Sequence, residues 1–140
     1  MAKKVIFDGV PSGMLDAVWP TVAPMILKPL QRTGADKCYS LESILKACHN
    51  HSMQLWIAVV DDKPVAAFIT QIITFPLRKV FDCFLVGGEQ MDDWIDEAWT
   101  TLKAYAKNCH CDGIRGFGRA GWTRRLPDKI EYSVMWDLSL

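Results

Sequence analysis

The sequence has no long hydrophobic run and no excess of charge of either sign. Lysine plus arginine and aspartate plus glutamate number 16 each among its 140 residues, so the formal net charge is zero. A neutral chain generates no overall field toward nucleic acid or a membrane surface, and neither is expected as a partner. No apolar run approaches the roughly 20 residues of a membrane span. Lys3 and Lys4 precede only three apolar residues before Asp8, a pattern that does not predict a secretory signal.

A regular cysteine framework is also absent. The five cysteines are an odd number at irregular spacing, which is typical of a protein made in a reducing cytoplasm. Two short clusters, Cys48–His51 and Cys109–Cys111, combine cysteine with histidine, and each follows a predicted helix. Neither has the cysteine spacing of most zinc sites. We therefore predict no metal, and we interpret the cysteines as small buried hydrophobic residues and the histidines as helix-terminal charges.

The common catalytic signatures are missing as well. No G-x-S-x-G, H-E-x-x-H or P-loop pattern occurs, so the motifs leave any catalytic residues unknown. No internal repeat or low-complexity linker divides the chain. Its length suits one domain spanning residues 1–140 with a real core, and it is too short for two.

The sequence does contain a strand–glycine–helix unit between Val80 and Cys111. An apolar run from Val80 to Val86 meets the pair Gly87–Gly88, and an amphipathic helix follows. The apolar residues of that helix recur at three- and four-residue spacing and share one face: Trp94, Ile95, Ala98, Trp99, Leu102, Tyr105 and Ala106. A strand that turns through glycines into a helix is a natural anion site, because the turn amides and the helix N-terminus present positive dipoles.

The start of the same helix is acidic. Its carboxylates are Glu89, Asp92, Asp93 and Asp96. They would stabilise the helix through its dipole but would repel a bound phosphate. Two like charges about 4 Å apart repel by about 1 kcal/mol in water, and by more when they are partly buried. We interpret Asp92 and Asp93 as helix-capping residues rather than as part of a phosphate site.

In the first half of the chain, the residue pattern predicts a short strand and two helices. Lys4–Phe7 is the strand, and residues 14–31 form a helix in pieces. We expect breaks or kinks at Pro20, Pro24 and Pro29, because each proline lacks a backbone donor. A second helix covers Leu41–His49, with Ser40 as its N-cap.

In the second half of the chain, the residue pattern predicts most of the strands of the sheet. Strands are expected at Leu55–Val60, Val65–Phe75, Lys79–Val86 and Gly113–Phe117, with a hairpin turn over residues 61–64. A last strand is predicted over Ile130–Leu140, where apolar and polar residues alternate with a period of two. One face of that strand, including Tyr132, is expected in the core, and Glu131 lies on the opposite face.

This order of elements resembles the GNAT superfamily of N-acetyltransferases. The resemblance covers nearly the whole chain, and its most specific part is LWIAVVDDKPVAAFITQIITFP with the strand–glycine–helix unit after it. It implies an α+β fold, with a mixed, mainly antiparallel twisted sheet and helices on both faces. The segment IRGFGRAGWTRRL also resembles GNAT-like small proteins of tailed bacteriophages.

The resemblance implies an acetyl-CoA site at the start of the central helix. The family's loop there has the pattern Gln or Arg, two residues, Gly, one residue, Gly or Ala, and its amides hold the pyrophosphate. The corresponding residues here are Val86, Gly87, Gly88, Glu89 and Gln90. The glycine pair survives as a turn, but the expected glycines after Gln90 are missing. The family's tyrosine acid and glutamate base have no matching motif in this chain.

A basic turn near the end is the best candidate for a partner surface. Its residues are Arg119, Trp122, Arg124 and Arg125. Arginine and aromatic side chains dominate binding hot spots, and arginine pairs well with carboxylates. An acidic protein surface or a second copy of the chain is therefore the expected partner. The alternatives are nucleic acid, which a neutral chain does not favour, and a solvated loop that balances the acidic helix start.

Two functions follow from these observations. The first is a non-catalytic interaction or assembly protein that kept the fold and lost the cofactor loop, such as a component of the head–tail connector region of a tailed-bacteriophage virion. It would use no cofactor. The alternative is an acetyl-CoA-dependent N-acyltransferase with an atypical pyrophosphate loop. The acidic helix start favours the first function and the order of elements favours the second, although fold alone does not establish function.

Overall fold

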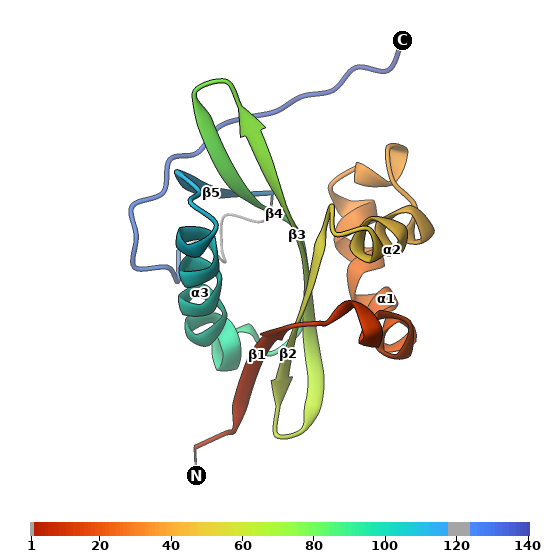
Figure 1. Cartoon of the computed structure of the whole chain (residues 1–140), viewed down its shortest axis with the longest axis vertical. Coiled ribbons are helices and arrows are strands. Elements are labelled where there is room, and N and C mark those ends of the chain that lie inside the picture. Colours follow the sequence, from red (N-terminus) through yellow and green to blue (C-terminus); the bar gives the residue numbers. More distant parts are fainter. Residues whose placement is uncertain (1, 118–123) are drawn as a thin grey trace.

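The computed structural model describes residues 2–117 and 124–140 (Figure 1). Its helices are α1 (Leu15–Arg32), α2 (Leu41–His49) and α3 (Met91–Asn108). Its strands are β1 (Val5–Gly9), β2 (Gln54–Val60), β3 (Lys63–Phe75), β4 (Arg78–Gly88) and β5 (Gly113–Gly116). Two single-turn 3-10 helices, η1 (Ser12–Met14) and η2 (Ala35–Lys37), stand on either side of α1. The order of these elements is the predicted one.

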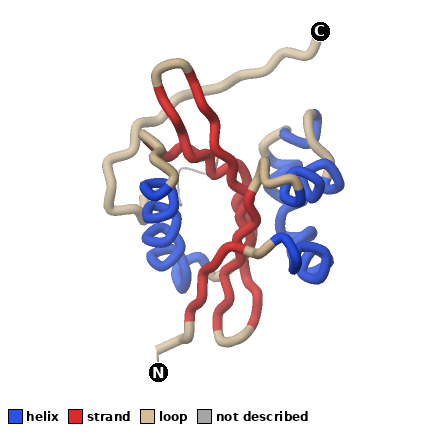
Figure 2. Tube along the Cα trace, in the orientation of Figure 1, coloured by secondary structure: helices blue, strands red, loops and turns tan. Residues whose placement is uncertain are grey.

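The five described strands form one mixed sheet in the order β1-β2-β3-β4-β5. Neighbouring strands are antiparallel except β4 and β5, which run parallel. Figure 2 shows α3 on one side of the sheet and α1 and α2 on the other. The prediction of an α+β fold with helices on both faces is therefore confirmed. None of the described helices is long and apolar enough to cross a membrane.

The turn between β2 and β3 is a two-residue hairpin made of aspartates. Asp61 and Asp62 have positive φ angles of 50° and 67°. Positive φ at both central residues is the backbone of a type I′ turn, and aspartate tolerates it better than most residues. Asp61 Oδ1 also accepts a hydrogen bond of 2.9 Å from the backbone N–H of Lys4. The predicted turn is confirmed, and it additionally ties the chain before β1 to the hairpin.

An aromatic cluster fills the space between the sheet and α3. The ring of Trp56 stacks on Phe7 with centroids 5.7 Å apart, and Trp94 meets Phe68 edge to face at 5.4 Å. The buried residues of α3 are Trp94, Ile95, Ala98, Leu102 and Ala106. These residues belong to the predicted apolar face, and the spacing of that face therefore predicted which side of α3 meets the sheet.

The structure corrects the prediction for α1, which is one continuous helix rather than a helix in pieces. Pro20 and Pro24 lie on its exposed side, where water can bind the carbonyls that lose a helical donor. Pro29 is buried, and the carbonyl that it leaves without a donor belongs to Met25. Packing on the sheet keeps the chain helical through these positions. The buried residues are Leu15, Val22, Ile26, Pro29 and Leu30.

The helix α2 begins with the predicted cap. Ser40 Oγ accepts a hydrogen bond of 3.0 Å from the N–H of Ser43, and Ser43 Oγ accepts one of 2.9 Å from the N–H of Ser40. This reciprocal pair is a capping box in which serine takes the usual place of glutamate. Ile44 and Cys48 are buried beneath the helix. The prediction for α2 is confirmed in both its bounds and its cap.

The predicted strand over residues 130–140 is wrong for this structure. The chain there pairs with no described strand, and Figure 1 shows it ending outside the sheet and helices. Tyr132, which was expected in the core, is 65% exposed. An alternating pattern marks a segment that is able to form a strand, but a strand also needs an edge to pair with. This segment meets no such edge within the described part of its own chain.

Gly87 is the point where α1 and β4 touch. A Cβ atom built on Gly87 would lie 1.9 Å from the carbonyl oxygen of Met25 and 3.1 Å from Pro29 Cδ. That carbonyl is the one that Pro29 deprives of its helical donor. The proline and the glycine together let the helix backbone rest directly on the strand. One glycine of the predicted phosphate turn therefore has a packing role.

Replacing Gly87 with alanine should destabilise the fold by about 1–3 kcal/mol, because rigid backbone atoms occupy the space of the new methyl group. Gly13→Ala is the matched control, since a Cβ atom there meets nothing within 4 Å. Urea unfolding at neutral pH should show a lower midpoint for Gly87→Ala only. Equal midpoints for the two variants would show that α1 can shift over β4 freely.

Candidate functional site

The strand β4 contains one residue more than the stretch of β3 that it faces. Ile69 pairs with Leu85, and the next residue, Thr70, pairs with Cys83, so Phe84 has no partner across the ladder. Such a bulge bends a strand and interrupts the alternation of its side chains. As a result, Phe84 and Leu85 both pack in the cluster between the sheet and the helices α1 and α2.

The strand β4 also loses its second neighbour at the bulge. β5 pairs with β4 from Val80 to Cys83 and ends at Gly116. From Phe84 to Gly88, β4 therefore has a described strand, β3, on one side only. The N–H and C=O groups on its other side can pair with an extended ligand, as they can at any sheet edge.

Asp82, two residues before the bulge, is a buried carboxylate that is 1% exposed. Gln71 donates a hydrogen bond of 3.0 Å to Oδ2, and Arg115 Nε lies 3.6 Å from Oδ1. The distance to Arg115 is too long for a hydrogen bond, so Oδ1 has no hydrogen-bond partner among the described residues. Burial raises the pKa of Asp82, and Gln71 and Arg115 oppose that rise without cancelling it.

Arg115 stands across the parallel ladder from Asp82. Its guanidinium lies over the rings of Phe75 and Phe117, 5.4 and 5.7 Å from their centroids. The Arg115 side chain is 43% exposed, so it connects the buried carboxylate with solvent. A titratable group and a cation that reaches solvent therefore meet where β4 and β5 part.

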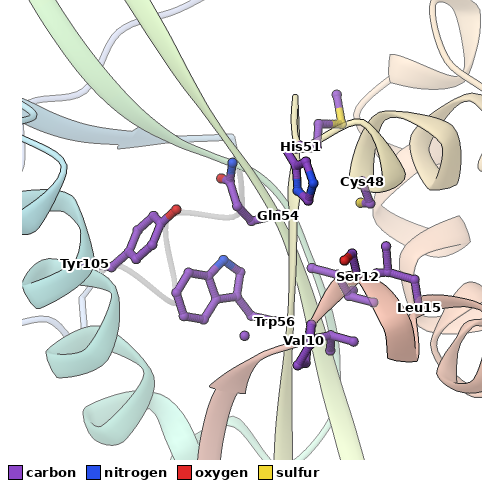
Figure 3. A pocket seen from close by; sticks show the side chains of 12 residues that line it. Val10, Ser12, Leu15, Cys48, His51, Gln54, Trp56 and Tyr105 are labelled. Carbon is purple, nitrogen blue, oxygen red and sulfur yellow. The ribbon is translucent and has the colours of Figure 1, made fainter.

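A cavity of about 290 Å³ opens near the other edge of the sheet, where β1 ends (Figure 3). In Figure 3, Tyr105 of α3 lies on the same side of β2 as Gln54 and Trp56, and Ser12 and His51 lie on the other. The lining thiol of Cys48 is no ready nucleophile, because burial raises its pKa to about 11.

The cavity and Asp82 lie apart in the sheet and share no residue. Thr70 accepts a hydrogen bond of 2.8 Å from the Trp56 indole and donates one of 2.9 Å to Gln54 Oε1, which lines the cavity. The next residue, Gln71, turns instead to Asp82. Successive residues of a strand point to opposite faces. The cavity and the carboxylate are therefore separate candidate sites.

The predicted phosphate turn is a tight connection rather than an open loop. Gly88 has a φ angle of 139°, and a Cβ atom there would lie 2.3 Å from the carbonyl oxygen of Val65. The N–H of Glu89 donates to that oxygen at 2.9 Å, and the Trp94 indole donates to the Glu89 carbonyl at 2.8 Å. The backbone N–H and C=O groups of Glu89 are thus already occupied, by β3 and by α3 respectively.

The residue that caps α3 is Gln90 and not one of the aspartates. Gln90 has a φ angle of 59°, and its side chain makes no capping hydrogen bond. Asp92 and Asp93 lie in the first turn. Their interpretation as caps is therefore corrected, although both still stand at the end of the helix dipole that favours negative charge. Val86, at the other end of the predicted loop, is half-buried.

Two of the four carboxylates at this helix start are paired with cations of the same chain. Lys3 Nζ lies 2.9 Å from Asp93 Oδ2, and the Arg125 guanidinium binds Asp92 Oδ1. The hydrogen bond and the charge of Asp93 raise the pKa of Lys3. Pairs as exposed as these add little to stability. They do reduce the repulsion that this end of the helix would exert on an anion.

The predicted partner surface is described only in part. Arg119 and Trp122 lie outside the described residues. Arg124 is exposed, and Arg125 contacts Asp92. For Arg125 the structure shows the balancing contact that was the alternative interpretation of this turn. Binding of a partner by the turn stays a prediction.

The cysteine and histidine clusters form no metal site in the described part of the chain. No group of three or more His, Cys, Asp or Glu side chains there could hold an ion. The five cysteines are free thiols, and Cys48 and Cys83 are buried. His49 lies at the end of α2 and pairs with Asp16 at 2.8 Å.

The sequence analysis predicts neither Asp82 nor Gln71 as a site residue. A signal does exist, because Asp82 is the one charged residue in the apolar run from Val80 to Val86. A carboxylate in a buried strand is costly unless it is paired, so it indicates either a partner or a function. The identity of that partner depends on the strand register, which the sequence does not reveal.

The fold matches those of solved acetyltransferases. The aminoglycoside acetyltransferase meta-AAC0020 from an uncultured soil metagenomic sample, in complex with sisomicin, has a TM-score of 0.68 at 9% identity, over 97% of this chain and 96% of its own. Aminoglycoside N-acetyltransferase AAC(6')-Iy in complex with CoA has a TM-score of 0.64 at 8% identity, over 99% and 97%. Ribosomal-protein-alanine N-acetyltransferase from Brucella melitensis biovar Abortus 2308 has a TM-score of 0.67 at 10% identity, over 97% and 100%.

No protein-family model and no curated protein sequence matches the chain. The structural matches show that it has the GNAT acetyltransferase fold. At identities of 8–10% the likeness shows the fold alone, and the chemistry must be argued from the site.

Asp82→Asn should raise the melting temperature at neutral pH by a few degrees. Because burial raises the pKa of Asp82, its charged form penalises the folded state above that pKa, and the penalty disappears once the carboxylate is protonated. The gain should therefore shrink as the pH falls toward the ordinary aspartate value of about 4. Asp36→Asn, at an exposed carboxylate, is the control without such a trend. A loss of stability at every pH would contradict a buried, incompletely paired charge.

Proposed function

We propose that this chain is an acyl-CoA-dependent N-acyltransferase that works where β4 and β5 part. The observation that carries the proposal is the bulge at Phe84, which leaves one edge of β4 without a described strand next to the buried carboxylate of Asp82. Acetyltransferases with the same fold, one of them solved with CoA, support this class of chemistry.

The residues fit an acyl-CoA better at its acyl end than at its phosphate end. The arm that carries the thioester contains amide groups, and the edge from Phe84 to Gly88 offers backbone groups to pair with them. At the phosphate end, α3 presents helix N–H groups but no glycine loop, and its first turn holds Asp92 and Asp93. The cations that pair with these carboxylates offset part of the repulsion.

Acyl transfer from a thioester forms a C–N bond to the acceptor amine as the C–S bond breaks, and the amine must lose a proton. Asp82 is suited to take that proton, because its Oδ1 has no hydrogen-bond partner among the described residues and burial raises its pKa. Gln71 fixes the orientation of the carboxylate through Oδ2. Arg115 lies between Oδ1 and solvent, so movement of its side chain gives the acceptor access to the carboxylate.

Calorimetry with acetyl-CoA, combined with a turnover assay on amine acceptors, tests this function. We expect a dissociation constant tighter than about 1 mM, which corresponds to about −4 kcal/mol. Asp82→Asn should leave that constant unchanged and lower kcat/KM by roughly 100- to 10,000-fold. Asp82→Glu should keep part of the activity, and Asp36→Asn should keep all of it. The wild-type rate should fall as the pH is lowered through the raised pKa of Asp82, because a protonated carboxyl cannot accept a proton.

The two parts of this proposal fail in different ways. A lack of binding at millimolar acetyl-CoA would contradict the acyltransferase function as a whole. Binding and turnover with undiminished kcat/KM in Asp82→Asn would remove Asp82 from the reaction and leave the function standing.

A non-catalytic interaction or assembly protein, such as a virion component of a tailed bacteriophage, is the second candidate. Two observations favour it: the carboxylates in the first turn of α3, and the large apolar side chains exposed over residues 130–140. Such a protein would bind no acyl-CoA and would associate with itself or another protein. The calorimetry above separates the two candidates, since only the first predicts heat on addition of acetyl-CoA.

A further inference from the structure

The helix α3 ends in a turn that has a cysteine on either side. Cys109 is the C-cap of the helix, and the next residue, His110, has a positive φ angle of 59°. The N–H of His110 donates to the carbonyl of Lys107 at 3.0 Å, and the N–H of Cys111 donates to that of Ala106 at 3.0 Å. These two hydrogen bonds define a Schellman motif, in which the chain turns back through a left-handed residue.

The turn keeps Cys109 and Cys111 close together. Two residues separated by one other have Cα atoms at most about 7 Å apart in an extended chain, and the distance is shorter across a turn. A disulfide spans Cα distances of about 4.4–6.8 Å. Burial raises the pKa of Cys111, the ammonium of Lys79 opposes that rise, and the neighbouring Cys109 adds to it. The backbone therefore brings the two cysteines within the range of a disulfide.

Lys79 of β4 fixes both ends of this turn. The N–H of Asp112 donates to the carbonyl of Lys79 at 2.7 Å, and the N–H of Lys79 donates to Asp112 Oδ2 at 2.9 Å. The ammonium of Lys79 donates in turn to the carbonyl of Cys109. Its charge stands at the negative end of the α3 dipole, where a cation is favoured. The two thiols are thus carried by backbone that is tied to the sheet.

Both thiols of this turn can be reached by a small reagent. Cys109 and Cys111 are partly exposed, and a cavity of about 140 Å³ adjoins Cys111. Lys103 and Lys107 line the same cavity, so a reagent that carries negative charge is favoured there. The other cysteines are either buried or have no second cysteine close to them in the sequence: Cys48 and Cys83 in the first case, Cys38 in the second.

We propose that Cys109 and Cys111 are a reversible dithiol–disulfide pair, which a small anionic disulfide such as oxidised glutathione oxidises. The carboxylates of such an oxidant suit the two lysines of the cavity beside Cys111. A reducing cytoplasm returns the pair to the dithiol, so the disulfide forms only when the thiol pool is oxidised. This reaction is independent of acyl transfer, which would take place on β4.

Oxidation of the pair takes place in two thiol–disulfide exchange steps. The Cys109 thiolate attacks one sulfur of the oxidant, whose S–S bond breaks and releases one thiolate. The Cys111 thiolate then attacks the Cys109 sulfur and expels the second thiolate. The two protons of the protein thiols pass to the released thiolates, so the pair loses two electrons and the oxidant gains them. Cys111 takes the second step, because its raised pKa slows attack on a free oxidant and proximity compensates for this in ring closure.

Intact-mass spectrometry of the full chain after treatment with oxidised glutathione tests the pair. Cys38→Ser is the background, because the exposed Cys38 would form an adduct of its own. The background protein should lose the mass of two hydrogen atoms and keep no glutathione, and a digest should place the disulfide between Cys109 and Cys111. Adding Cys111→Ser should trap the glutathione adduct on Cys109. Adding Cys109→Ser should slow the formation of any adduct by about tenfold or more.

A matched pair of substitutions at His110 tests whether the turn brings the thiols together. His110→Gly keeps the positive φ angle accessible, and His110→Val opposes it. In glutathione redox buffers, the equilibrium constant for the disulfide should be kept in His110→Gly and should fall by about fivefold or more in His110→Val. Equal constants in the two variants would overturn the inference. A lasting glutathione adduct on the background protein, or no oxidation of it, would overturn the inference as well.

Discussion

The extra residue in β4 is the constraint on which the rest of the structure depends. The bulge at Phe84 divides β4 into two halves. The first half pairs with both β3 and β5, and the second half pairs with β3 as its one described neighbour. The first half buries Asp82, and the second half ends at Gly87, where α1 rests on the strand. The carboxylate, the open edge and the helix contact therefore all take their positions from one added residue.

Burial distinguishes Asp82 from the carboxylates at the start of α3. Asp82 is enclosed, has an oxygen without a hydrogen-bond partner among the described residues and has a raised pKa. The acidic residues at the start of α3 are more exposed, and Asp92 and Asp93 pair with cations of the same chain. A buried charge strains a fold far more than a surface charge does, and it persists mainly where it serves a function or a specific pairing. The strand carboxylate is for this reason the stronger indication of chemistry.

The sequence predicted most helices and strands well, but it did not predict which residues they pack against or pair with. The cap at Ser40 and the turn at Asp61 and Asp62 depend on adjacent residues, so local signals were sufficient. The helix α1 continues through its prolines because it packs on the sheet and because water can reach its exposed side. A local sequence pattern reveals neither of these. The bulge and the partners of Asp82 depend on register with β3 and β5, so the centre of the candidate site was missed. Residues 130–140 have the pattern of a strand, but they pair with no described strand of this chain.

The most direct test of this account is to map acetyl-CoA on the backbone amides by ¹H–¹⁵N NMR. If the bulge opens β4 to an acyl donor, the shifts should concentrate between Phe84 and Gly88 and at the first amides of α3. The amides around the cavity at the end of β1 should stay undisturbed, because that cavity lies at the other edge of the sheet. Shifts confined to that cavity, or no shifts along the second half of β4, would contradict the account.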